Sequence, residues 1–391
     1  MRHISIISPF QYNPGNHSHV VTYLQGLKGG DKPGQYLLVG ANNSPGPRPV
    51  GLVYQGPLDS VENHGISGSG TWRTVAVPKR FDAAGTSVYG PDNLSGNKVN
   101  FVGAYTRDLD GQSPSATEPS IVGFTYTGKV DGSTDRGWRS VQGTTQLGTP
   151  GTYTFVHSVD GGLAVGNTDN AEVDDLTRYF SLSSTAFIVD VDSGDQIPIR
   201  FPGDRNPFVT HTAYGIWDNG DNTYTIAGGS GEVDPHTSED SGRVEVGEAY
   251  LIDYDSITGE FDNYTSFPYR NGDKGDLVSH FEGIYRTGAG DYQLPATSVA
   301  LNDKGDETIA SVVTVKRNRR GDFKTEALWQ DLDITRSSDG TESVLTTGNS
   351  LYGDATVGFA NYPESDGSLT SLSFVFQDHY DYILGVFQQF L

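Results

Sequence analysis

The chain has 391 residues with no cysteine and one methionine, and its 26 Lys and Arg residues are outnumbered by 49 Asp and Glu residues. The absence of cysteine excludes disulfide bridges, zinc–thiolate sites and thiol nucleophiles. The formal net charge of −23 argues against nucleic acids and anionic membranes as main partners, because an acidic surface is repelled by both. An acidic surface of this kind also favours solubility.

Long apolar stretches are missing as well. No segment approaches the roughly 18 apolar residues of a membrane-spanning helix, and the N-terminal sequence MRHISIISPFQYNPGN lacks the apolar core of a signal peptide. Four N-x-Ser/Thr sequons permit glycosylation, at Asn16, Asn42, Asn93 and Asn263. We therefore expect a secreted glycoprotein, or one in the lumen of the secretory pathway, with its leader already removed. A cytoplasmic location is the alternative.

The chain is rich in glycine (50 residues), proline (19 residues) and aromatic residues (11%). Aromatic and β-branched residues among many turn formers are typical of an all-β protein. The segment from Val209 to Pro268 shows the pattern best, because Thr210–Gly229 and Ala249–Phe267 each contain two short strands joined by a tight turn. We expect these four strands to form one antiparallel sheet.

The same order of strands recurs six times along the chain. Each first strand ends near an anchor position, and these positions are Gly26, Gly90, Ser158, Gly215, Gly283 and Gly353. A unit repeated at intervals of 57 to 70 residues indicates a propeller or a solenoid. Because radial closure protects the edges of short strands, the pattern favours a propeller.

The predicted fold is therefore all-β: a six-bladed β-propeller of four-stranded antiparallel blades, closed by terminal strands, in a single domain of residues 1–391. The predicted blades are residues 14–78, 79–143, 144–202, 203–269, 270–334 and 335–391, with residues 1–13 as the closing strand. That strand is expected on the outside of the last blade. The C-terminal run YILGVFQQFL is the alternative for the same place.

One unit resembles a kelch repeat. The resemblance lies in the second strand from Tyr224 to Gly229, in the third strand AYLIDYDSITGEF and in an aromatic residue of the fourth strand. Since only this unit has the Gly228–Gly229 pair, the resemblance implies a kelch-like topology.

The ligand site is expected at the axis, on the face of the long loops 106–120, 169–184, 230–247 and 335–347. The first strands would supply its floor. His and Glu in one pocket can perform acid–base chemistry, and Tyr hydroxyls can donate to a carbonyl. The candidate catalytic residues are His280, Glu282, His211 and His157, and the candidate substrate-binding residues are Tyr23, Gln25, Tyr89, Phe155, Tyr214 and Tyr352. The alternative role for the tyrosines is hydrogen bonding between blades.

No metal or cofactor is expected. Residues 218–222 contain acidic residues like those of a calcium loop but lack its 12-residue frame, which favours a plain turn. The chain contains no G-x-S-x-G elbow, no H-E-x-x-H motif and no phosphate loop.

Three segments carry a resemblance to a group of fungal and bacterial propeller proteins: Thr212–Gly229, His280–Ile284 and Val156–Asn167. Some fungal members resemble hetero-Diels–Alderases of tropolonic sesquiterpene pathways. The resemblance implies a cofactor-free cyclisation or cycloaddition in secondary metabolism. The ligand would be a small apolar molecule, polyketide- or terpenoid-like, held in the axial pocket and polarised by hydrogen bonds.

Two alternatives stay open. The first is a carbohydrate-active propeller, either a glycoside hydrolase or a lectin, in which a loop residue such as Asp204 or Asp273 would join Glu282 as the second carboxylate. The second is a non-catalytic scaffold for a protein partner. A deep apolar pocket with one central carboxylate would favour cyclisation. Two facing carboxylates would favour glycoside hydrolysis, and a filled channel would favour the scaffold.

Overall fold

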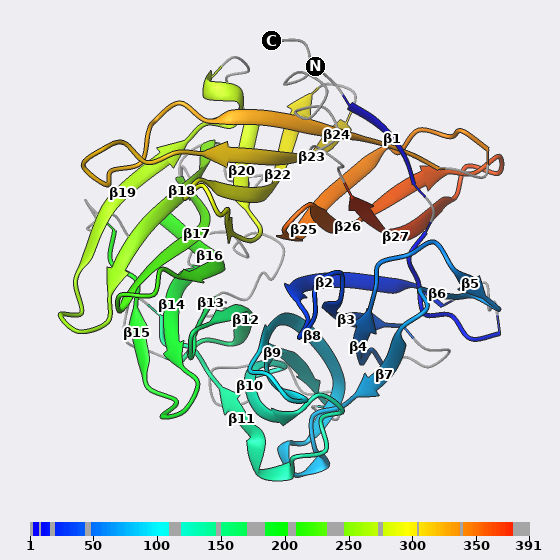
Figure 1. Ribbon diagram of the computed structural model, residues 1–391, viewed down its shortest axis with the longest axis horizontal. Helices are drawn as coiled ribbons and strands as arrows, with labels where there is room; N and C mark the ends of the chain where they lie inside the picture. Colours follow the sequence, from blue (N-terminus) through cyan, green and yellow to red (C-terminus); the bar gives the residue numbers. More distant parts are fainter. Residues whose placement is uncertain are drawn as a thin grey trace, which may run out of the picture.

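The computed structural model describes residues 3–7, 9–15, 20–43, 48–108, 119–145, 150–169, 184–201, 209–232, 246–272, 277–302, 305–336 and 339–377. These residues form an all-β protein whose sheets are arranged around a common axis (Figure 1). Three short 3-10 turns interrupt the strands, at Lys79–Phe81, Asp135–Gly137 and Tyr269–Gly272. Within the described part of the chain, no helix is long and apolar enough to cross a membrane.

The strands follow one another as antiparallel meanders, one for each repeat. The first three meanders are β2 (Thr22–Gly29), β3 (Tyr36–Asn42), β4 (Val50–Gly56) and β7 (Thr71–Val75); β8 (Ala83–Asn93), β9 (Lys98–Arg107), β10 (Ile121–Lys129) and β11 (Trp138–Val141); β12 (Tyr153–Asp160), β13 (Leu163–Asp169), β14 (Thr185–Asp190) and β15 (Gln196–Pro198). A small hairpin of β5 (Glu62–Asn63) and β6 (Ile66–Ser67) extends the first meander.

The next three meanders continue in the same sense. They are β16 (Val209–Asp218), β17 (Thr223–Glu232), β18 (Val246–Asp255) and β19 (Phe261–Phe267); β20 (Leu277–Phe281) with β21 (Tyr285–Arg286), β22 (Tyr292–Asn302), β23 (Gly305–Val315) and β24 (Leu328–Arg336); β25 (Leu345–Tyr352), β26 (Ala355–Pro363) and β27 (Leu369–Gln377). The sheet predicted from Val209 to Pro268 is confirmed, with strand order β16-β17-β18-β19.

Six apolar clusters hold the meanders together, and each lies between two neighbours. The first and second share a cluster that includes Val39 and Phe124, and the sixth and first share one that includes Val357 and Leu24. The other four clusters join the second to the third, the third to the fourth, the fourth to the fifth and the fifth to the sixth. Burial of these faces against each other is the main stabilising contribution to the fold.

The N-terminal segment lies along two meanders and not along the last one alone. Strand β1 (His3–Ile7) pairs in parallel with β24 of the fifth meander, and Pro9 forms an antiparallel bridge with Phe374 of β27. The chain then reaches the sixth meander, where the Phe10 backbone N–H donates to the Ser373 carbonyl at 2.9 Å. The outer edge of β24 is available because β24 is the last strand of its meander, and an unpaired edge accepts a further strand. The C-terminal alternative, YILGVFQQFL, lies outside the described residues.

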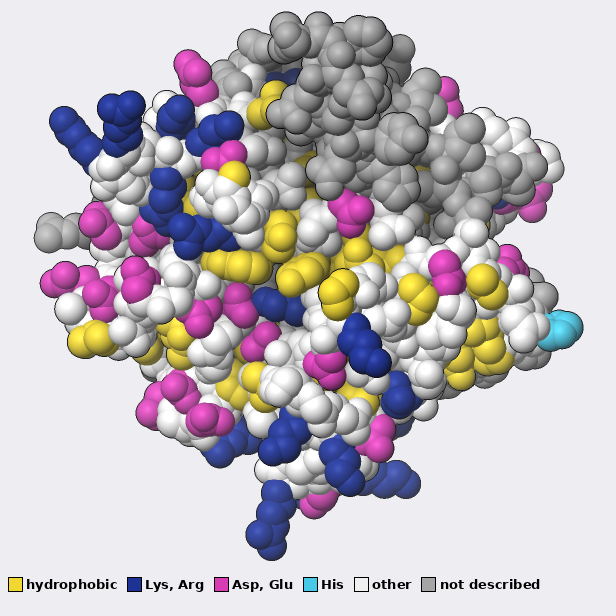
Figure 2. All heavy atoms as spheres, in the orientation of Figure 1, with side chains coloured by type: hydrophobic (Ala, Val, Ile, Leu, Met, Phe, Trp, Pro, Cys, Tyr) yellow, Lys and Arg dark blue, Asp and Glu magenta, His cyan; other side chains and the backbone are white. Residues whose placement is uncertain are grey.

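The face shown in Figure 2 has acidic and basic side chains interspersed over much of its surface, while hydrophobic side chains gather around its centre. The charge is therefore distributed and not collected in one acidic region on this face.

Candidate functional site

A β-bulge interrupts the innermost strand of five meanders. The pairing register shifts at the same place in β2, β8, β12, β16 and β25, and the residues in the shifts are Gln25, Tyr89, His157, Tyr214 and Asn349. In the fifth meander, Glu282 follows β20 directly, and its backbone N–H donates to the Pro295 carbonyl at 2.8 Å. A bulge turns a side chain away from the regular alternation of a strand. All six of these side chains therefore face the axial pocket.

The residue after the bulge must be small because neighbouring inner strands approach closely there. A Cβ atom on Gly26 would lie 2.2 Å from the Tyr89 carbonyl oxygen, and one on Gly90 would lie 2.7 Å from the His157 carbonyl oxygen. The sixth meander meets the first through Asn349, whose Nδ2 donates to the Leu24 carbonyl at 2.7 Å. The repeated glycine is thus explained by packing around the axis.

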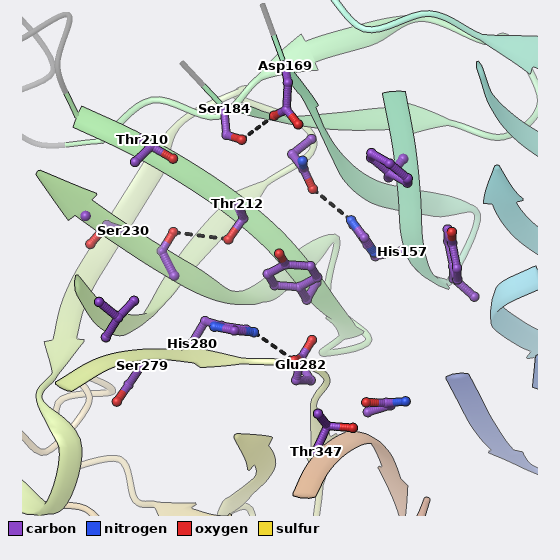
Figure 3. Close-up of a pocket in the computed structure, with 18 of the residues that line it drawn as sticks. His157, Asp169, Ser184, Thr210, Thr212, Ser230, Ser279, His280, Glu282 and Thr347 are labelled. Carbon is purple, nitrogen blue, oxygen red and sulfur yellow. Dashed lines mark hydrogen bonds and ion pairs between the residues drawn. The ribbon is translucent and has the colours of Figure 1, made fainter. Parts of the chain in front are cut away.

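The pocket has a volume of about 550 Å³. Hydroxyl, amide and imidazole groups line it together with the rings of Tyr89, Phe155, Tyr214 and Phe359. Figure 3 shows His280, Glu282 and Thr347 on one side of the cavity and Asp169, Ser184 and Thr210 on the other.

The most polar contact in the pocket joins His280 and Glu282. The His280 Nε2 lies 2.7 Å from Glu282 Oε1, and the two side chains are 25% and 17% exposed. Burial opposes the charged form of each group, but their mutual attraction and hydrogen bond outweigh it. They lower the pKa of Glu282 and raise the pKa of His280. Each partner therefore favours the charged form of the other.

The pKa of His157 is shifted in the opposite direction to that of His280. Burial lowers the pKa of His157 to about 4, so the ring is neutral near pH 7. Its Nε2 lies 2.7 Å from Asn167 Oδ1, which makes Nε2 the protonated nitrogen and leaves Nδ1 as an acceptor. The ring packs between Tyr89 and Tyr214, with centroid distances of 5.5 and 4.4 Å.

The two tyrosines of the floor keep their protons. Burial raises the pKa of Tyr89 to about 12. Burial, together with the nearby charge of Glu282, raises the pKa of Tyr214 further. Both hydroxyls are therefore hydrogen-bond donors to a ligand at any physiological pH.

A second carboxyl group, Asp169, lies in the pocket and was not predicted. It is the last residue of β13, where it accepts a hydrogen bond from the Ser184 hydroxyl. Burial raises the pKa of Asp169 to about 6. The predicted site residues belong to first strands, whereas Asp169 is on a second strand and Ser184 immediately precedes a third. Only the sheet pairing of Thr168 with Thr185 brings them together.

The structure brings together seven of the ten predicted site residues in the pocket lining: Gln25, Tyr89, Phe155, His157, Tyr214, His280 and Glu282. Tyr352 is placed elsewhere. In the sixth meander the bulge lies at Asn349, so the anchor position is Ser350 and not Gly353. The Tyr352 ring instead packs against Tyr285 at 4.9 Å.

Two other predicted residues are also absent from the described lining. The His211 ring stacks on Phe201 with a centroid distance of 3.7 Å, because alternate residues of a strand face opposite sides and its neighbour Thr212 faces the pocket. Tyr23 packs edge-to-face on Phe359, which itself lines the cavity. The loop carboxylates Asp204 and Asp273 lie outside the described residues.

Three sequons have their side-chain amides engaged within the protein. The Nδ2 atom of Asn42 donates to the Tyr12 carbonyl, that of Asn93 to the Asp31 carboxylate, and that of Asn263 to the Asp253 carboxylate. Glycosylation at these positions would break the bonds. Asn16 lies outside the described residues.

No group of three His, Asp or Glu side chains that could hold a metal ion occurs among the described residues. Residues 218–222 form a turn in which Asp218 accepts from the Gly220 backbone at 2.7 Å and Asp221 accepts from the Thr223 hydroxyl at 2.5 Å. Both carboxylates therefore accept hydrogen bonds from within the turn itself.

No protein-family profile matches the chain, and no curated protein matches it. Among solved structures, the chain is similar to an α-L-arabinanase from Penicillium chrysogenum complexed with arabinobiose, at 12% identity, with 96% and 98% of the two chains covered and a TM-score of 0.43. It is also similar to an α-L-arabinofuranosidase from Lactobacillus brevis, at 10% identity, with 78% and 94% of the two chains covered and a TM-score of 0.40. A luciferin-regenerating enzyme is similar at 10% identity, with 92% of each chain covered and a TM-score of 0.39. At TM-scores below 0.5, these similarities establish neither a family nor an activity for the chain.

Proposed function

We propose that the chain is a carbohydrate-active enzyme whose axial pocket binds a sugar and whose His280–Glu282 pair performs acid–base chemistry on it. One observation carries the proposal: the His280 imidazole contacts the Glu282 carboxyl group at 2.7 Å in a cavity that is lined by hydroxyl groups, amide groups and aromatic rings.

The lining favours a sugar because a sugar ring has both polar edges and apolar C–H faces. Hydroxyl groups from Thr212, Ser230 and Thr347 surround the cavity, and each can donate and accept a hydrogen bond. The rings of Phe155 and Phe359 offer apolar faces for stacking. Pockets that combine apolar walls with a few placed polar groups fix the orientation of their ligands.

In this proposal, a water molecule attacks the anomeric carbon and Glu282 accepts its proton, while the glycosidic C–O bond breaks and the leaving oxygen takes a proton from His280. Transfer of the proton from Glu282 to His280 then restores the pair. The Tyr214 hydroxyl donates a hydrogen bond to a ligand oxygen. A general base of this kind contributes about 10²- to 10⁴-fold to a rate. Glycoside hydrolysis is the reaction class to assay first.

We assign the acid–base chemistry to Glu282 and not to Asp169, because Glu282 has His280 as a proton-exchanging partner at 2.7 Å, whereas Asp169 is held by the neutral Ser184 hydroxyl. Figure 3 shows Asp169 on the opposite side of the cavity from Glu282. In this proposal, Asp169 is a group that contacts the ligand.

The six meanders are taken as the blades of one propeller, closed where the sixth blade packs against the first, with the N-terminal segment along the outer edges of the fifth and sixth. The six interfacial clusters support this arrangement. The pocket then lies on the propeller axis.

A second candidate is the cofactor-free cyclisation of a terpenoid- or polyketide-like ligand. It is favoured by the three aromatic rings that pack around His157, those of Tyr89, Phe155 and Tyr214, which could hold an apolar molecule in a reactive geometry. In this case Tyr214 would polarise a ligand carbonyl, and Glu282 would have no proton to remove.

A thermal-shift screen followed by turnover assays tests the proposal. The screen compares mono- and oligosaccharides with apolar terpenoid compounds, and aryl glycosides report hydrolysis. We expect sugars to stabilise the protein and Glu282→Gln to lower kcat by at least about 100-fold. Glu326→Gln, at an exposed position, is the matched control and should change nothing. Stabilisation by apolar compounds alone would contradict the proposal and favour cyclisation.

A further inference from the structure

The lining of the pocket has no basic side chain of the Lys or Arg type within the described residues. It contains two carboxyl groups, from Asp169 and Glu282, and two histidines, in a chain whose formal net charge is −23. His280 balances Glu282, and His157 is neutral. An anionic ligand such as a uronate would therefore meet a pocket of negative potential and be repelled.

Asp169 differs from the other buried aspartates of the described chain. Asp92 has Lys28 at 3.9 Å, and Asp331 is paired with Arg270. Asp169 is only 6% exposed, yet its described partners are the neutral Ser184 hydroxyl and the neutral Asn167 amide. A buried carboxylate without a cation is costly, and burial raises the pKa of Asp169 accordingly.

The surroundings of Asp169 would suit a positively charged group on the ligand. Figure 3 shows Thr210 and Ser184 on the same side of the cavity as Asp169, and both offer hydroxyl oxygens to an ammonium. The aromatic rings of Phe155 and Tyr214 also line the cavity, and ring faces attract cations. A ligand ammonium would thus supply the counter-charge that Asp169 lacks among the described residues.

We propose that the pocket selects a ligand that carries a protonated amine, and that Asp169 is the residue that receives this group. Resting on the function proposed above, the inference makes an amino sugar the preferred substrate class over neutral sugars and over uronates. Asp169 is a specificity-determining residue in this scheme, and the His280–Glu282 pair keeps its separate role in the chemistry.

Titration calorimetry of the full chain at pH 7 tests the inference. The ligands are glucosamine, galactosamine and mannosamine, each measured beside its parent hexose. We expect at least one amine to bind about tenfold more tightly than its parent, since a charge-assisted hydrogen bond contributes on this scale. Asp169→Asn keeps an acceptor for Ser184 and should abolish this preference, so that amine and parent hexose bind with equal affinity to the variant. Asp195→Asn removes one charge at an exposed turn and should leave the preference intact.

Equal binding of amine and parent, or a preference that survives in Asp169→Asn, would overturn the inference. If no hexose of either kind binds, the proposed function fails, and a non-sugar pair decides the inference separately. Cyclohexylamine binding that exceeds cyclohexanol binding and depends on Asp169 would uphold it, and the absence of such a difference would overturn it.

Discussion

We expect Lys28 to be the charged residue that contributes most to the stability of the inner strands around the axis. It lies three residues beyond Gln25 on β2, and its ammonium lies 2.8 Å from Asp160 and 3.9 Å from Asp92. It also lies 4.9 Å from the centroid of the Trp217 ring. The side chains of Lys28, Asp160 and Asp92 are 16%, 13% and 10% exposed, so Lys28 joins the inner strands of three meanders in a poorly solvated place.

Replacing Lys28 by Met removes the cation and leaves two buried carboxylates facing each other. Breaking a buried ion pair costs about 3 to 5 kcal/mol, and because Lys28 retains some exposure we expect a loss of about 3 kcal/mol. For a domain of 391 residues this corresponds to a fall in Tm of about 4 °C. Urea unfolding followed by tryptophan fluorescence measures the free energy.

The defect should depend on pH in a defined direction. Burial raises the pKa of Asp92, and Lys28 opposes this effect. Without Lys28, the folded-state pKa of Asp92 rises further above its unfolded value. The folded state then binds more protons than the unfolded state, and stability is lost as pH rises through the raised pKa of Asp92. We expect a large defect at pH 7.5 and a smaller one at pH 4.5.

Lys316→Met is the matched control, because the Lys316–Asp291 pair at 3.3 Å has side chains that are 58% and 28% exposed. Exposed pairs contribute about 0 to 1 kcal/mol. Equal stability losses in the two variants, or a Lys28→Met defect that is the same at both pH values, would refute the reasoning.

Two further predictions concern buried polar groups. Asp331 accepts hydrogen bonds from the Tyr269 hydroxyl at 2.9 Å and the Ser311 hydroxyl at 2.8 Å, and it pairs with Arg270. Asp331→Ala should therefore lower the free energy of unfolding, measured in urea, by about 3 kcal/mol. Asp135→Ala, in the exposed pair with Arg80, should lower it by less than about 1 kcal/mol. Comparable losses in the two variants would contradict this prediction. Because burial lowers the pKa of His157 to about 4, the unfolded state binds more protons than the folded state between about pH 6.5 and 4, and stability contributed by the neutral ring is lost as pH falls through that range. His157→Gln should flatten this part of the stability profile by a few kcal/mol, and an unchanged profile would show that His157 is not a neutral buried base.

The strands and their order were accessible from the sequence because each meander repeats the same alternation and the same turns. The small residue after the inner bulges, glycine in the first, second and fourth repeats, was also visible, since only a small residue allows the close approach of β2 to the Tyr89 carbonyl. These features are local, and they recur several times along the chain.

The features that depend on register were not accessible in the same way. In the sixth repeat, the Tyr352–Gly353 pair fits the sequence pattern at least as well as Asn349–Ser350. The hydrogen bonds with β26, together with the contact from Asn349 to Leu24 in the first meander, put the bulge at Asn349. Asp169 was missed for a related reason, because its place in the pocket depends on pairing between strands and not on its own repeat position.

Histidine side-chain NMR tests the central claim most directly, because His280 and His157 both lie in the pocket. The pKa of His280 is raised above that of an ordinary histidine, and the pKa of His157 is lowered. The account predicts that addition of a sugar ligand shifts the imidazole signals of His280 and His157 and leaves that of the exposed His64 unchanged. It also predicts that Glu282→Gln lowers the pKa of His280. Saturating sugar that leaves the His280 and His157 signals unmoved would contradict the claim that this pocket is the functional site.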